Sequence, residues 1–166
     1  MYTTVNQFIK EFSYEYQSSL KVFKNITNES LLANANDNMR SLQRLVWHIT
    51  VTQAEMLGKA GLTINGPEEH SKPSNNVIEI CDLYEISAKS VLEQVEKEWA
   101  DNDLQTEMDM YGEKWTKATV LNVLIKHEVH HRGQLTALMR LHNLVVPGVY
   151  GPSKEEWGTF GMEAPE

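Results

Sequence analysis

Apolar side chains recur at spacings of three and four residues in four segments of the chain, residues 5–23, 41–60, 77–99 and 116–141. This spacing gathers them on one face of an α-helix, because residues three and four apart lie on the same side of it. Ser41 and Thr116 are good N-cap residues at the start of two of the segments. Four amphipathic helices must bury their apolar faces against one another, so the pattern predicts an all-α fold, a four-helix bundle.

The segments between the predicted helices are rich in turn-forming residues. Residues 25–38 contain five Asn, which predicts a long loop between the first two helices. Residues 104–111 partly alternate, as in one short strand, but a strand without a partner forms no sheet, so none is predicted. After residue 147 we expect an irregular tail with one turn of helix at 153–157. Its aromatic residues pack on the bundle or contact a second subunit: Tyr150, Trp157 and Phe160.

Length, charge and cysteine content restrict the class of protein. A chain of 166 residues fits one domain, 1–166, and its formal net charge of -8 disfavours nucleic acid or an anionic membrane as a partner. No apolar run approaches the roughly 20 residues that cross a bilayer. The N-terminus lacks the pattern of a secretory signal, and the single cysteine, Cys81, cannot form an internal disulfide, so we expect a cytoplasmic protein. Cys81 falls on an apolar helix face, where burial makes a thiol unreactive.

Two histidines lie on the predicted apolar face of the last helix. His127 and His131 are four residues apart, so their rings lie one above the other, whereas His130 points away from them. Burying two imidazoles costs several kcal/mol (~2–7 for each polar group) unless their nitrogens find partners. The pair therefore predicts either a metal site or a dedicated hydrogen-bond network, and we favour the metal.

A third ligand is expected from the second helix. Catalytic zinc sites use three protein ligands and leave one position for water or substrate. His48 flanks the apolar face of its helix and is the best candidate. His70 lies in a turn-rich run that predicts a mobile loop, and His142 lies about 16 Å along the helix axis from His131, too far to share its ion.

The same residues also satisfy a metallopeptidase pattern. Residues 127–131 read His-Glu-x-x-His, in which Glu128 would be the general base. One extended form of that motif requires Gly and His where this chain has Gln134 and Ala137, and no sheet edge is predicted to hold a peptide. Glu128 also projects away from His131 around the helix, so we expect it to make a structural hydrogen bond, and peptidase activity is a remote alternative.

Taken together, the motifs around the three histidines resemble those of the DinB-like family, also called the DinB/YfiT-like metalloenzymes. The resemblance rests on residues 40–49 around His48, on residues 127–135, which read His-Glu-Val-His-His-Arg-Gly-Gln-Leu, on Gly-Glu-Lys-Trp-Thr at 112–116 and on Pro-Gly at 147–148. It implies an up-down-down-up four-helix bundle, often dimeric, with His48, His127 and His131 as the ligands of one divalent ion. Related branches act as S-transferases or isomerases that use a low-molecular-weight thiol.

These observations predict a divalent-metal protein with an open coordination position, acting on a small molecule as a thiol S-transferase or a hydrolase. Imidazoles accept zinc, nickel, copper or iron, with zinc or nickel favoured here. Three side chains are candidate pocket groups, but no catalytic residue is assigned: Tyr111, His130 and Gln134. The alternatives are a noncatalytic protein whose metal only joins two helices, and a partner-binding bundle with hydrogen-bonded histidines. A homodimer is expected.

Overall fold

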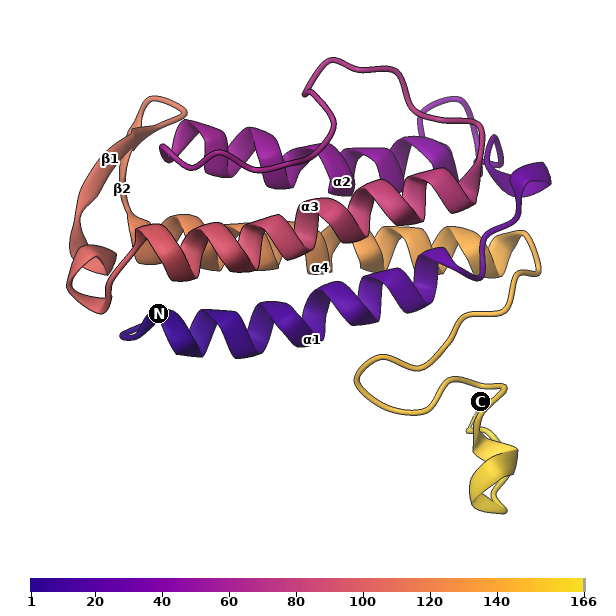
Figure 1. Ribbon diagram of the computed structural model, residues 1–166. Coiled ribbons are helices and arrows are strands. Elements are labelled where there is room, and N and C mark those ends of the chain that lie inside the picture. Colours follow the sequence, from indigo (N-terminus) through magenta and orange to yellow (C-terminus); the bar gives the residue numbers. More distant parts are fainter. Residues whose placement is uncertain (166) are drawn as a thin grey trace.

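The computed structural model describes residues 1–165, in which four α-helices form a bundle (Figure 1). The helices are α1 (Val5–Phe23), α2 (Leu42–Lys59), α3 (Val77–Glu98) and α4 (Lys117–Leu141). The helices α1 and α4 run in one direction and α2 and α3 in the other, so the order is up-down-down-up (Figure 1). The helical prediction and the predicted four-helix bundle are confirmed. None of the helices described is apolar enough over sufficient length to cross a membrane.

Each helix begins at a polar residue whose side chain accepts a hydrogen bond from the first turn. Thr4, Ser41, Asn76 and Thr116 are the N-caps of α1 to α4 in that order. Such caps satisfy backbone N–H groups that have no partner inside the helix. The parallel arrangement of α2 and α3 requires a connection that runs back along α2. Residues 60–76 provide it, and the Trp47 indole N–H anchors it by donating to the carbonyl of Ser71 at 3.0 Å.

A β-hairpin between α3 and α4 corrects the expectation that no sheet forms. Strands β1 (Glu107–Met110) and β2 (Glu113–Thr116) pair antiparallel. The two residues between them, Tyr111 and Gly112, both have positive φ, +54° and +87°, as a tight hairpin turn requires. The sequence does not reveal the partner strand, because its second half, residues 115–116, falls at the predicted beginning of the last helix. Four residues are too few to show alternation, and Tyr-Gly is not one of the dipeptides typical of such turns.

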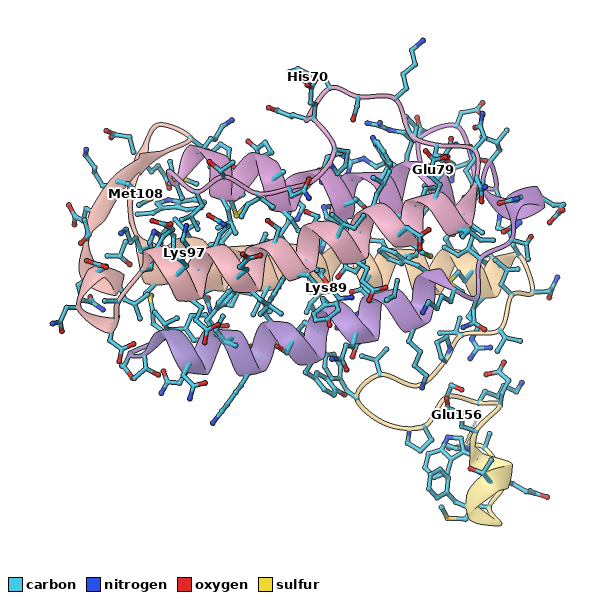
Figure 2. The ribbon with its side chains drawn as sticks, in the orientation of Figure 1. His70, Glu79, Lys89, Lys97, Met108 and Glu156 are labelled. Atoms are coloured by element: carbon cyan, nitrogen blue, oxygen red, sulfur yellow. The ribbon has the colours of Figure 1, made fainter. Side chains whose placement is uncertain are left out.

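A polar layer divides the apolar core at the middle of the bundle. One apolar cluster, which includes Phe8 and Leu121, lies toward the hairpin, and the other, which includes Phe23 and Leu138, lies toward the opposite end. Between the two clusters lie buried polar side chains from all four helices: Glu15, Ser19, Gln53, Ser87, Glu128 and Arg132. Cys81 is buried as predicted. Lys89 and Lys97 extend from the solvated face of α3, with side chains 62% and 66% exposed (Figure 2).

The C-terminal segment leaves the bundle, and its last described part stands apart from the helices (Figure 1). Tyr150 stacks on Tyr14 of α1 with ring centroids 6.2 Å apart, so this aromatic residue docks on the bundle as expected. The single helical turn is a 3-10 helix at Trp157–Phe160, later than the predicted 153–157. Phe160 is 61% exposed and does not pack on the bundle, so its contact with a second subunit stays a prediction.

Candidate metal centre

Three histidines from two helices converge at the level of the polar layer. His48 comes from α2, and His127 and His131 lie one turn apart on α4. One ring nitrogen of each lies within 4.8 Å of those of the other two, and the Nε2 atoms of His48 and His127 are 3.0 Å apart. Zinc–nitrogen bonds of about 2.0–2.1 Å in a tetrahedral site place two nitrogens about 3.3 Å apart. The three side chains therefore fit one ion with small side-chain movements.

The environment keeps these imidazoles neutral, which is the form that binds metal. Burial, with the charge of Arg40 second, lowers the pKa of His48 to about 4. Burial and the neighbouring His131 lower the pKa of His127 to about 4. The pKa of His131 is also lowered, chiefly by burial, although its hydrogen bond with Gln134 acts in the opposite sense. At neutral pH all three rings can offer a lone pair.

Gln134 orients one of the rings. Nδ1 of His131 lies 2.7 Å from Oε1 of Gln134. An amide oxygen only accepts, so Nδ1–H is the donor and Nε2 is left with its lone pair. Partners of this kind commonly fix the tautomer and orientation of a metal-binding histidine. His130 is exposed and contacts Gln134 at 3.2 Å, on the outside of the site.

Two cavities open beside the three histidines. The larger, about 490 Å³, lies between α2, α4, the hairpin and the loop 60–76, and is lined by His48, His127 and Tyr111 among others. The smaller, about 330 Å³, is lined by His131, Gln134 and the segment that precedes α2. The histidines thus lie between two hollows. Tyr111 and Gln134 each line a cavity, whereas neither cavity includes His130.

Comparison with known proteins identifies the family of the chain. The model of the DinB family matches residues 1–164. The chain belongs to the DinB family. It is 33% identical over 166 residues to the uncharacterized protein YrdA of Bacillus subtilis (strain 168), covering 100% of this chain and 99% of that protein.

Solved DinB-like structures share the fold. The crystal structure of a DinB-like protein from Bacillus cereus is 35% identical, with a TM-score of 0.86 over 90% of this chain and 100% of that one. The DinB-like protein YjoA of Bacillus subtilis, 18% identical, has a TM-score of 0.67 over 86% of this chain and 96% of its own. The resemblance inferred from the motifs is confirmed, and so is the fold that it implies.

The remaining histidines of this DinB-family chain lie outside the cluster. His70 is exposed on the loop over α2 (Figure 2) and is one of the residues that line the larger cavity. Nε2 of His142 lies 3.1 Å from the carbonyl of Asn34, at the end of α4. Of the cluster itself, His131 is 9% exposed but His127 is only half-buried. The pair therefore lies at the edge of the buried face of α4, where the cavities reach it, and not along the centre as the apolar spacing predicted.

Glu128 occupies the centre of that buried face, on the side away from the histidines. It is 2% exposed and accepts a hydrogen bond from each of the other three helices. Its donors are the Ser19 hydroxyl at 2.7 Å, the Tyr84 hydroxyl at 2.5 Å and the Gln53 amide at 3.5 Å. Burial raises the pKa of Glu128. The carboxylate ties the four helices together and does not reach the site, which agrees with the predicted structural hydrogen bond and argues against a peptidase base.

A buried ion pair next to Glu128 was missed in the sequence. Arg132 Nη2 lies 2.6 Å from Glu15 Oε2, and the two side chains are only 4% and 7% exposed. Arg132 also donates to the Ser19 hydroxyl at 3.0 Å, and the Tyr150 hydroxyl donates to Glu15 at 2.8 Å. A signal was present, because Glu15, Glu128 and Arg132 each interrupt an apolar face. Charged residues at such positions are almost never buried unless they are paired.

Proposed function

We propose that the protein binds one divalent metal ion, zinc or nickel, through His48, His127 and His131, and acts on a small molecule at that ion. The convergence of three neutral imidazoles within 4.8 Å of one another carries this proposal. Three protein ligands leave a coordination position for a reactant. A divalent ion there lowers the pKa of a thiol or water that it contacts, which makes a nucleophile available at neutral pH.

The reaction class that we propose is transfer of a small thiol to an electrophile, with hydrolysis as the variant in which water is the nucleophile. The sulfur forms a bond to an electrophilic carbon, the leaving group departs with its bonding electrons, and the thiol proton passes to solvent. Two cavities that meet at the histidines support a reaction with two reactants. Gln134 holds the His131 ring through Nδ1, and Trp47 and Trp115 give the larger cavity apolar walls that exclude water.

The metal content of matched variants tests this proposal. His131→Gln removes one ligand and should lower metal affinity by more than about 100-fold, since loss of a supporting partner alone costs about 10- to 100-fold. His142→Gln is the matched control, because His142 lies at the end of α4 on the carbonyl of Asn34. We expect one equivalent of metal in the parent and control proteins by elemental analysis. Equal metal affinity of parent and His131→Gln after reconstitution would refute the site.

A structural role for the metal is the second candidate, because the three ligands would join α2 to α4. In that case removal of the metal lowers the melting temperature, but a panel of small thiols and electrophiles shows no metal-dependent turnover. Turnover that is lost in His131→Gln and kept in His142→Gln favours the enzyme. Assembly as a homodimer and a cytoplasmic location stay predictions, to be tested by sedimentation and by fractionation of cells.

A further inference from the structure

Two arginines flank the three histidines, one at each cavity. Arg40 comes just before Ser41, the N-cap of α2, and lines the smaller cavity together with His131. Arg44 lies in the first turn of α2 and lines the larger cavity together with His48. Arg44 and His48 are four residues apart, so they lie on the same face of the helix.

In the part of the chain that the structure describes, no side chain forms an ion pair with either of these two arginines. The chain has four arginines, and the other two are paired, Arg132 with Glu15 and Arg140 with Glu155. Within residues 1–165, neither Arg40 nor Arg44 has a carboxylate within ion-pair distance or donates a side-chain hydrogen bond. In a chain with a formal net charge of -8, the two arginines left without partners are the two beside the histidines.

Their position on the helix is also unfavourable for folding. The N-terminus of a helix carries a partial positive charge and favours acidic side chains. The first turn of α2 contains no acidic residue and has Arg44 instead. Helix stability therefore does not explain these cations, whereas an anion placed beside them would gain from both guanidinium groups and from the helix terminus.

We propose that Arg40 and Arg44 bind an oxyanionic group, a carboxylate or a phosphate, of the small molecule that reacts at the histidine cluster. This inference rests on the proposed function and adds the chemical class of its substrate. A guanidinium group donates parallel hydrogen bonds to two oxygens of such a group, which makes the contact geometrically specific. The acidic group would lie toward the N-terminus of α2, and the rest of the molecule would extend past His48 into the larger cavity, where Trp115 and Val123 offer apolar contact.

The test compares two small thiols that differ in charge. Protein loaded with cobalt(II) is titrated with 3-mercaptopropionate and with 2-mercaptoethanol, and thiolate binding is followed by the sulfur-to-cobalt absorption. The parent should bind the carboxylate thiol at least about 10-fold more tightly, since a hydrogen bond to a charged group contributes about that factor. The Arg40→Gln/Arg44→Gln double variant should lose this preference and keep its cobalt spectrum. Arg140→Gln, which removes an arginine remote from the histidines, should behave as the parent.

Failure of the inference can be told apart from failure of the proposed function. Equal affinities of the parent for the two thiols, or a preference that survives in the double variant, overturn the anion subsite while the cobalt spectrum upholds the metal site. If no cobalt binds, the proposed function fails, and the metal-free protein is titrated with succinate, inorganic phosphate and neutral succinamide by calorimetry. The subsite is supported, and its oxyanion identified, if succinate or phosphate binds saturably and only the double variant loses this binding. Absence of saturable binding overturns it.

Discussion

The ion pair between Arg132 and Glu15 should be among the most important polar interactions for the stability of the bundle. Arg132→Met keeps a long side chain of apolar character but removes the charge, so Glu15 is left in a site where its side chain is 7% exposed. It also removes donors to the Glu15 carbonyl and the Ser19 hydroxyl. Breaking a buried pair by removing one partner costs about 3–5 kcal/mol, because an uncompensated buried charge remains.

The assay is unfolding of the metal-free protein, by urea and by heat, in the presence of a chelator so that bound metal does not contribute. For a domain of this size about 1 kcal/mol shifts the melting temperature by about 2–4 °C, so Arg132→Met should lower it by roughly 6–20 °C. Arg140→Met is the control. Its pair with Glu155 has side chains 38% and 37% exposed, and its loss should cost less than about 1 kcal/mol.

A double variant examines the physical cause. If the cost comes from the unpaired charge of Glu15, Glu15→Met/Arg132→Met should be more stable than Arg132→Met, because that charge is removed as well. A loss in Arg132→Met no larger than in Arg140→Met would refute the reasoning. So would a double variant less stable than the single one, which would mean that packing and hydrogen bonds at Arg132 matter more than the charge.

Three further predictions follow from local features. Gly112→Ala should destabilise the protein by about 1 kcal/mol or more in urea unfolding, because φ of Gly112 is +87°. Gly58 lies within α2 with open space around it, so Gly58→Ala should stabilise the protein by about 0.5–1 kcal/mol. Similar effects of the two substitutions would contradict the turn geometry. Cys81, whose pKa burial raises to about 11, should react with a thiol reagent only after unfolding, and rapid modification of the native protein would show that it is accessible. Burial lowers the pKa of His48 and His127 from 6.5 to about 4, so the unfolded chain binds more protons in that window. The contribution of these two histidines to the stability of the metal-free protein should therefore be complete above pH 6.5 and decrease as the pH falls toward 4. His48→Gln should lose less stability than the parent over this range. An equal loss would exclude His48 as a cause.

Local sequence patterns are sufficient to predict the helices and to indicate which histidines are candidate metal ligands. Apolar spacing and N-caps act over a few residues, so the sequence is sufficient to place all four helices and caps such as Ser41 and Thr116. The spacing of His127 and His131 predicts that they face one ion, for the same reason. Ligand chemistry and the family resemblance indicate His48 as their partner, and the fold brings its Nε2 to 3.0 Å from that of His127.

Spacing within a single helix is sufficient to predict the four amphipathic helices and the pairing of His127 with His131 on one face. The surroundings of the histidines depend on tertiary packing. The partner of β1, the bond from Tyr84 to Glu128 and the pairing of Arg132 with Glu15 join residues that are weakly patterned or far apart in the chain. Such contacts depend on how the helices rotate and slide against one another. The same packing makes the histidines a site between two cavities and leaves two arginines beside them without a partner among the described residues.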